Sequence, residues 1–204
     1  MRDAFARTDV DYADERFDDA DLGDLDILAC RFTRCSFRGA DLSGTAIDRC
    51  AFTDCDFTAA RLNASRHEQT AFANCTFRGA RLFGAEFVAC KLVGADFREA
   101  DLAALTVKGG DWSYAILRFQ DLSGRNLRGV RLAEADLYEC NLERTDLRDA
   151  DLSRANLDKA RLAGADLRGA TLDGVDLSTL ALRGARIDVA QAVALARALG
   201  ALVE

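Results

Sequence analysis

Residues 38–77 read RGADLSGTAIDRCAFTDCDFTAARLNASRHEQTAFANCTF, and a large residue returns at every fifth position. The series is Leu42, Ile47, Phe52, Phe57, Leu62, His67, Phe72 and Phe77. His67 is the only histidine in the chain and the only polar member of this series. The fold must therefore satisfy a period of five and place one histidine in an otherwise apolar row.

The register of five continues in both directions without an insertion. Thirty-six positions from Tyr12 to Ile187 follow it, and all except His67 are large and apolar. Two places before each of them, from Val10 to Ala185, thirty of the thirty-six residues are Ala, Cys, Ser, Thr, Val or Gly. Because residues two apart on a strand face the same side, we expect both positions to point inward.

A period of five excludes a continuous helix, which turns about 500° in five residues, and a flat strand, whose faces alternate every two residues. A coil of short sides and tight corners fits the period. At a spacing of twenty, positions 17, 37, 57, 77 and 97 are all Phe. Every twentieth position from 22 to 182 is Leu. This stacking predicts four sides per coil and about nine coils, a rod roughly 43 Å long at ~4.8 Å per coil.

The repeat resembles the pentapeptide-repeat family, whose motif is A(D/N)LXX. The segments that carry it are ADLSG (40–44), ADFRE (95–99), ADLYE (135–139), TDLRDADLSRANLDKARLAGADLRG (145–169) and VDLST (175–179). The resemblance covers residues 10–187 and implies an all-β fold, a right-handed quadrilateral β-helix. We therefore expect a lead-in at 1–9, the β-helix at 10–187, and a C-terminal capping and dimerisation helix at 188–204.

The charge of the chain is concentrated at its beginning. The net charge is −7, and residues 1–30 alone, with ten acids and three arginines, account for all of it. No apolar run approaches the roughly 20 residues that a membrane span needs, and the N-terminus lacks an apolar signal core. We expect a cytoplasmic protein without membrane contact.

All seven cysteines fall at the small inward position, namely Cys30, Cys35, Cys50, Cys55, Cys75, Cys90 and Cys140. They are interpreted as small buried hydrophobes that replace alanine. Three of them, at 35, 55 and 75, form one column in which oxidative pairing is conceivable, but a reducing cytoplasm disfavours it. With one histidine and no CxxC pair, no zinc site is expected.

Nothing in the sequence resembles an active site. His67 is expected to be a neutral buried imidazole with a backbone partner, or to lie on a side flipped slightly outward. No nucleophile with a supporting acid is evident near it, and the chain has no phosphate loop or metal cluster. We predict a non-enzymatic protein without a cofactor, which acts through its surface.

The repeat is most disturbed at residues 103–125, where Leu105, Gln120 and Arg125 fill slots for small side chains. A buried arginine without a partner is costly, so we expect a bulge or splayed corner near 120–125. Three apolar residues at outward positions form a candidate contact patch: Tyr114, Ile116 and Phe119. The alternative is local packing around the bulge.

The period ends at Ile187, and the following DVAQAVALARALGALVE predicts a helix. Asp188 is a natural N-cap, Gln191 completes a capping-box pattern, and Gly200 is placed to end the helix. The apolar residues exceed what one end cap requires: Val189, Val193, Leu195, Leu199, Leu202 and Val203. They predict a homodimer contact, and a monomeric cap is the alternative.

The resemblance is nearest to the mycobacterial and plasmid-borne fluoroquinolone-resistance branch of the family. It implies a DNA-mimicking rod that binds DNA gyrase or another type II topoisomerase, modulates it or protects it from fluoroquinolones, and does not contact nucleic acid directly. The candidate binding residues form an outward acidic column: Asp56, Asp96, Asp136 and Asp176.

Two observations oppose mimicry along the middle of the rod. The chain is neutral outside residues 1–30, and basic residues recur beside the acidic column at Arg38, Arg78, Arg98 and Arg118. The alternative function is a general protein-interaction scaffold or an antibiotic self-resistance accessory. The 103–125 patch would then be its contact.

Overall fold

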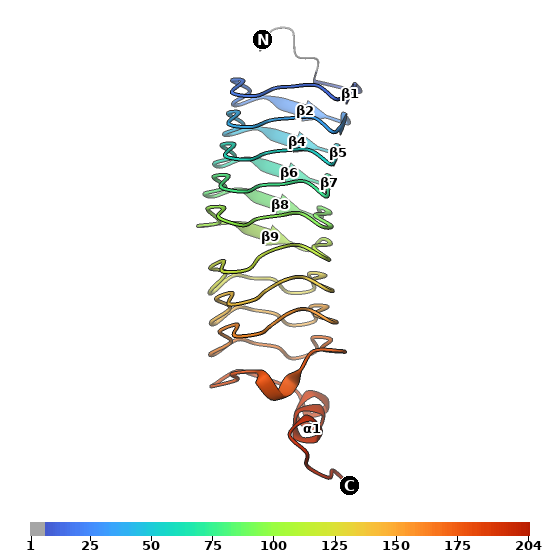
Figure 1. The fold of residues 1–204 in the computed structure, drawn as a ribbon, viewed down its shortest axis with the longest axis vertical. Helices are drawn as coiled ribbons and strands as arrows, with labels where there is room; N and C mark the ends of the chain where they lie inside the picture. Colours follow the sequence, from blue (N-terminus) through green and yellow to red (C-terminus); the bar gives the residue numbers. More distant parts are fainter. Residues whose placement is uncertain (1–6) are drawn as a thin grey trace.

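The computed structural model describes residues 7–204, which form a rod of stacked coils with the two termini at opposite ends (Figure 1). The strands lie in two parallel sheets. One sheet holds β1 (Asp11–Ala13), β3 (Arg31–Thr33), β5 (Ala51–Thr53) and β7 (Ala71–Ala73). The other holds β2 (Asp26–Leu28), β4 (Ala46–Asp48), β6 (Arg66–Glu68), β8 (Glu86–Val88) and β9 (Thr106–Lys108).

Within each sheet, neighbouring strands lie twenty residues apart in the chain. Phe32 lies opposite Phe52, and Ile47 lies opposite His67, which confirms four sides per coil. The named strands cover only about five coils, fewer than the nine expected. Beyond β9 the same spacing continues as isolated bridges between single residues, as far as the pair Asp166 and Arg186.

The corners of the coil depend on a residue with positive φ at every fifth position. Asp19, Ala59 and Lys159, for example, have φ of 54°, 57° and 56°. At the corner that contains Ala59, the Ala60 amide donates to the Phe57 carbonyl at 3.0 Å, and positive φ at the third residue is the mark of a type II turn. This conformation costs a non-glycine residue about 1 kcal/mol. Packing between coils must therefore offset the cost.

The interior is filled by columns of identical side chains. The ring centroids of Phe37 and Phe57 lie 4.9 Å apart with an interplanar angle of 4°, and those of Phe77 and Phe97 lie 5.0 Å apart. These separations match the distance between neighbouring strands, so stacking of the rings and hydrogen bonding of the coils reinforce each other.

His67 is wholly buried and continues this stacking, with its ring 4.5 Å from that of Phe87. Its Nε2 lies 2.9 Å from Ser65 Oγ, and the Ser65 hydroxyl donates to the Leu62 carbonyl at 2.7 Å. The hydroxyl hydrogen is thus committed, so Nε2 carries the imidazole proton and donates to Ser65, while Nδ1 is buried without a partner. The prediction of a buried imidazole is confirmed, but its partner is a side chain rather than the backbone.

All seven cysteines are buried and none forms a disulfide. Several thiols donate to backbone carbonyls, as Cys55 does to Phe32 at 3.4 Å. Burial raises the pKa of Cys50 and of Cys90 to about 11 and that of Cys140 to about 12. Their role as small buried apolar residues agrees with the sequence.

The rod ends in a short 3-10 helix, η2 (Leu177–Thr179), and an α-helix, α1 (Val189–Ala198). The capping box is present: the Asp188 carboxylate accepts from the Gln191 amide at 2.9 Å, and the Gln191 side chain accepts from the Asp188 amide at 3.1 Å. Gly200, with φ of 88°, follows the helix as the sequence predicts.

Gln191 also closes the last coil. Its side-chain Nε2 donates to the carbonyls of Leu167 at 2.6 Å and Ala170 at 2.8 Å. The Ala170 carbonyl, which accepts no backbone amide, would otherwise face the end of the rod unpaired. None of the helices formed by residues 7–204 is long and apolar enough to cross a membrane.

We predict that His67 makes folding sensitive to mild acid. Burial lowers its pKa from 6.5 to about 3, so below pH 6.5 the unfolded chain binds a proton that the folded chain excludes, and stability falls as pH falls. Between pH 7 and pH 5 the free energy of unfolding of the wild type should fall by about 2 kcal/mol more than that of His67→Phe. Urea denaturation at both pH values measures the free energy of unfolding. An equal decrease between pH 7 and pH 5 in the two proteins would contradict the prediction.

The buried thiols should react slowly. A thiol reagent at neutral pH is expected to label almost none of the seven cysteines in the native protein and all seven after denaturation, because the packed coils keep the reagent from the sulfur atoms. Mass spectrometry counts the labels. Rapid native labelling of four or more cysteines would show that the inward register is assigned incorrectly.

Candidate interaction surfaces

The outward acidic column exists over most of the rod. A line of parallel bridges at a spacing of twenty joins position 36 to position 156 and includes Asp56, Asp96 and Asp136. Asp176 does not continue this line. It is the N-cap of η2, and its carboxylate accepts from the Ser178 amide at 3.0 Å and hydroxyl at 2.6 Å.

Each of the three bridged acids forms an ion pair with an arginine. The pairs are Arg38 with Asp56 at 2.9 Å, Arg98 with Asp96 at 2.6 Å, and Arg118 Nε with Asp136 at 2.7 Å. The carboxyl groups are largely covered, with side-chain exposures of 31%, 13% and 22%. This side of the rod therefore carries both charges in alternation and does not present a bare line of carboxylates.

The same pairing holds along much of the surface. The hydrogen bond from Arg61 lowers the pKa of the Asp41 carboxyl to about 2 and is the largest effect on it. Burial acts in the opposite direction and raises this pKa. The hydrogen bond from Arg168 likewise lowers the pKa of the Asp166 carboxyl to about 2. The balanced charge of the sequence is thus arranged as local ion pairs.

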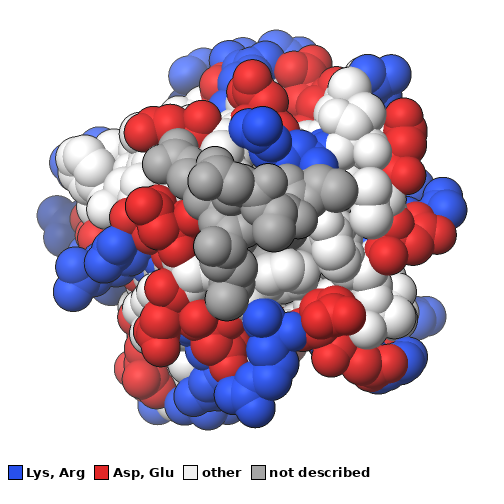
Figure 2. All heavy atoms as spheres, turned by 90° about the horizontal axis from the view of Figure 1, so that it is seen from above, with Lys and Arg blue, Asp and Glu red and all other residues white. Residues whose placement is uncertain are grey.

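The first coils differ, because several of their acids have no basic partner. Asp11 and Asp14 pair with Arg31 and Arg34. Within residues 7–204, no ion pair involves the remaining acids in question: Glu15, Asp19, Asp24 and Asp26. Figure 2 looks down on this end and shows acidic and basic side chains alternating around its rim. Acids without an ion pair therefore gather on the first coils.

The predicted apolar patch is divided between two corners. Tyr114 and Phe119 are 53% and 63% exposed, both at corner positions with positive φ, and Ile116 lies half-buried on the side between them. The ring of Phe119 contacts Tyr138, a residue that the sequence reasoning missed, with centroids 5.7 Å apart. The sequence could have indicated this contact, because Tyr138 is next to position 139, which lies twenty residues after Phe119 and therefore one coil further on.

Helix α1 ends at Ala198, within the predicted 188–204, and this C-terminal segment leaves much of its predicted contact surface exposed. Val189, Leu199 and Leu202 are 82%, 66% and 95% exposed. The other three predicted contact residues are half-buried: Val193, Leu195 and Val203. The C-terminal end of the rod thus carries large apolar side chains in contact with water.

The hydrogen-bonded ladder is interrupted between residues 99–109 and residues 118–128, a break that we call the seam. One coil earlier, the Leu82 amide donates to the Asp101 carbonyl at 2.9 Å, and one coil later the Leu122 amide donates to the Asn141 carbonyl at 2.9 Å. The corresponding bond from Leu102 to Asp121 is not formed. The predicted splayed corner is confirmed and extends over two sides of the coil.

The other two sides of this coil remain closed. The Phe97 amide donates to the Ile116 carbonyl at 3.0 Å, and the Arg131 amide donates to the Gly110 carbonyl at 3.1 Å. The seam is therefore a wedge-shaped opening in a continuous rod rather than a boundary between two separate bodies.

Large side chains in small slots explain the seam. Arg125 lies below Leu105 in a column whose other neighbours are Ala85 and Thr145, so two bulky groups compete for the space between coils. Gln120 is 8% exposed, and its side-chain amide reaches up to the Phe97 carbonyl at 2.8 Å.

Charge adds to this effect. Asp101 and Asp121 occupy successive positions of one outward column, and neither forms an ion pair within the described residues. Like charges at neighbouring positions of a sheet repel each other, so the two carboxylates favour separation of the coils.

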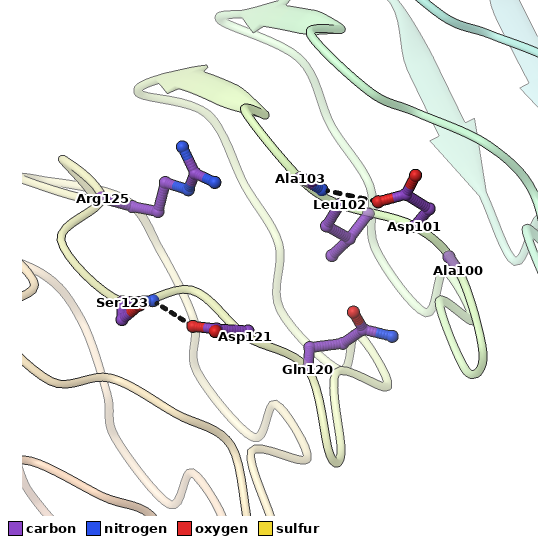
Figure 3. A pocket seen from close by; sticks show the side chains of 8 residues that line it. All are labelled: Ala100, Asp101, Leu102, Ala103, Gln120, Asp121, Ser123 and Arg125. Carbon is purple, nitrogen blue, oxygen red and sulfur yellow. Dashed lines mark hydrogen bonds between the residues drawn. The ribbon is translucent and has the colours of Figure 1, made fainter.

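A cavity of about 280 Å³ occupies the seam (Figure 3). Its lining residues are Ala100, Asp101, Leu102, Ala103, Gln120, Asp121, Ser123 and Arg125. Figure 3 shows Gln120 and Arg125 directed from the lower coil toward the upper one. Arg125 Nε is buried there without a hydrogen-bond partner. A second cavity of about 360 Å³ shares Ala100 and Gln120 and leads to Phe119.

Residues 7–204 contain no group of three or more His, Cys, Asp or Glu side chains arranged to hold a metal ion. The stacked side chains fill the interior of the coils formed by residues 7–204. The surfaces described above are therefore the candidates for function.

Comparison with solved structures finds close matches over the whole rod. Full-length QnrB1, a plasmid-mediated fluoroquinolone resistance protein, is 26% identical, with a TM-score of 0.84 over 96% of this chain and 99% of that chain. A trypsin-treated variant of QnrB1 is also 26% identical and gives 0.86 over 97% and 99%. HetL from the cyanobacterium Nostoc sp. strain PCC 7120, a pentapeptide repeat protein involved in heterocyst differentiation regulation, is 29% identical, with 0.59 over 88% and 85%.

Comparison with curated protein sequences finds no match. A model of the family described as pentapeptide repeats matches in eight copies, at residues 16–54, 80–111, 115–154 and 150–187. These segments cover most of the chain, and their repeats coincide with the stacked sides of the rod. The chain therefore belongs to the pentapeptide-repeat family.

Proposed function

We propose that this chain binds a type II topoisomerase, DNA gyrase, and protects it from fluoroquinolones. The observation that carries the proposal is the likeness to QnrB1, which extends over 97% of this chain and 99% of that chain at 26% identity. A rod with a filled interior acts through its outer surface, so binding, rather than chemistry, is the activity that this architecture supports.

The charged side chains give this surface two candidate contacts for a DNA-binding groove. One is the column of Asp56, Asp96 and Asp136, and the other is the group of unpaired acids on the first coils. The arginine side chains of these pairs are 57%, 42% and 41% exposed, and ion pairs at the surface contribute about 0–1 kcal/mol. The arginines that cover the column can therefore be displaced at small cost when lysines or arginines of a partner approach.

Dimerisation is the second part of the proposal. Exposed apolar residues on and after α1 include Val189, Leu199 and Leu202, and burying them against a two-fold mate would remove them from water. The resulting particle is a double-length rod whose central contact lies at the C-terminal ends. This arrangement would place the acidic first coils at its two tips.

A supercoiling assay tests the topoisomerase proposal directly. Gyrase activity is measured in the presence of a fluoroquinolone, with and without this protein. We expect the protein to restore supercoiling or to alter it at micromolar concentration. An assay in which gyrase is unaffected would contradict the proposal and favour a scaffold whose contact lies near Tyr114, Ile116 and Phe119.

Two charge-matched variants locate the contact. Asp56→Asn, Asp96→Asn and Asp136→Asn together remove three charges from the column, and we expect the apparent affinity for gyrase to fall at least tenfold. A tenfold loss corresponds to about 1.4 kcal/mol, a modest requirement for three charges in a complementary interface.

The control removes three charges from the first coils: Asp19→Asn, Asp24→Asn and Asp26→Asn. Asparagine tolerates the positive φ of 54° at positions 19 and 24. A larger loss in the control than in the column variant would exclude the column as the main contact. Titration of gyrase at two salt concentrations shows whether each loss is electrostatic.

The dimer prediction is tested by point substitutions, because deletion of the C-terminal segment would also remove Gln191 from the last coil. Leu199→Asp with Leu202→Asp should convert a dimer of twice 22.2 kDa into a monomer, since burial of two charges at an apolar contact is unfavourable. Light scattering measures the mass. Ala181→Asp, on the exposed side of the last coil, is the control and should leave the mass unchanged. A wild-type mass of 22.2 kDa would rule out the dimer.

A further inference from the structure

We propose that the seam binds an extended polypeptide segment with basic side chains, which adds a strand between the two open coils. This binding is separate from the proposed topoisomerase contact and uses a different part of the rod. The peptide chemistry follows from three features of the seam: its unpaired backbone groups, its two carboxylates without an ion pair, and the buried Nε of Arg125, which has no hydrogen-bond partner.

The backbone groups along the seam are arranged as in a sheet edge. We call residues 99–109 the upper lip of the seam and residues 118–128 the lower lip. On the upper lip the ladder bonds expected from the amides of Leu102, Ala104 and Val107 are not formed. One coil earlier, the bond equivalent to that of Ala104 is present, from the Gly84 amide to the Ala103 carbonyl at 3.0 Å. On the lower lip the corresponding carbonyl is that of Asp121, which receives no backbone amide. An extended peptide supplies a donor and an acceptor at every second residue and is the natural partner of such an edge.

The side chains of the seam select a basic peptide. A guest strand would place an outward side chain between Asp101 and Asp121. Neither forms an ion pair within the described residues, and Asp121 accepts from Asn141 Nδ2 at 2.9 Å. The same column shows the geometry required, because Arg61 pairs with Asp41 across one coil at 2.6 Å. A lysine or arginine of the guest would occupy the equivalent place and relieve the repulsion between the two carboxylates.

Inward positions of the guest would meet Leu102 and Leu122, which are 3% exposed. These neighbours favour a small apolar side chain. A backbone carbonyl of the guest would lie within the cavity that Arg125 enters and could accept from its buried Nε, which has no partner at present. The expected sequence pattern is therefore an alternation of basic and apolar residues.

The ends of the seam suit this role. A guest strand requires lips about 9.6 Å apart, twice the spacing of neighbouring strands. The seam closes at Gly109 and Gly110, with φ of 66° and 102°, and these two residues can absorb the rotation that widens the lips. At the opposite end, the cavity leads to the exposed ring of Phe119, which offers a contact to an apolar residue that leaves the seam.

Fluorescence anisotropy tests the proposal with a defined probe, a fluorescein-labelled octapeptide of alternating lysine and valine with blocked ends. We expect saturable binding to the full chain. The same peptide with N-methyl groups on its valine amides keeps every charge but cannot form the ladder, and it should bind at least tenfold more weakly. Equal binding of the two peptides would overturn the proposal, because attraction of opposite charges alone would then explain the affinity.

Two variants of the protein locate the site. Asp101→Asn with Asp121→Asn should weaken binding of the probe at least fivefold, whereas Asp158→Asn with Asp173→Asn, an equal change of charge at two acids away from the seam, should not. Leu105→Ala, Gln120→Ala and Arg125→Ala together restore small side chains to the slots and should close the seam and abolish binding.

The sole tryptophan reports on the seam independently of the label. Trp112 stacks on Phe97 at 5.3 Å, beside the closed edge of the same coil, and its fluorescence should change when the unlabelled probe binds. No binding up to millimolar concentration, or equal loss of binding in both pairs of aspartate variants, would overturn the proposal.

Discussion

The structure depends on one constraint, the stacking of each residue over the residue twenty positions further along the chain. Neighbouring coils can hydrogen bond only at the fixed spacing of β-strands, so each inward slot must hold a side chain that fits between copies of itself. Phenylalanine and leucine meet this condition by stacking, with centroids 4.9 Å apart for Phe37 and Phe57. Beside them, alanine and cysteine meet it by being small. The buried thiols and the buried imidazole follow from the same rule.

The seam shows what happens when the constraint is violated. Leu105 above Arg125 places two large groups where the rest of the column holds small ones, and the ladder opens on those sides alone. The coils remain joined elsewhere because Ile116 and Arg131 keep their bonds to the preceding coil. A local failure of the packing rule thus opens the ladder in the middle of the rod, around a cavity. It also leaves Arg125 and two aspartates at the opening without an ion pair.

Much of this architecture can be predicted from the sequence, because period and column are properties of the chain alone. The four sides, the stacked Phe column, the capping box at Asp188 and the opening near Gln120 all follow from residue spacing. The charge pattern of the surface does not. Whether Asp56 faces water or Arg38 depends on which rotamers of the arginine reach it, and the two residues are eighteen positions apart.

Other features required knowledge of the backbone. Asp176 keeps the spacing of its column, but it caps η2, so its carboxylate leaves the line. The preference of His67 for Ser65 depends on the direction of the Ser65 hydroxyl, which donates to Leu62. Tyr138 joins Phe119 because corners in successive coils lie side by side, a relation that pairs positions offset by nineteen as well as twenty. The candidate surfaces could therefore be listed from the sequence, whereas their charge and exposure could not.

Amide hydrogen exchange, followed residue by residue in the free protein by NMR, tests the central claim that side-chain size in the inward slots decides where the ladder forms. The account predicts that the amides of Leu102 and Ala104 exchange about 100-fold faster than those of Leu82 and Gly84, their equivalents one coil earlier, because an amide without a ladder bond is not protected by the fold. Equal protection at both levels would contradict the account, since the coils would then be joined at the seam as they are elsewhere in the rod.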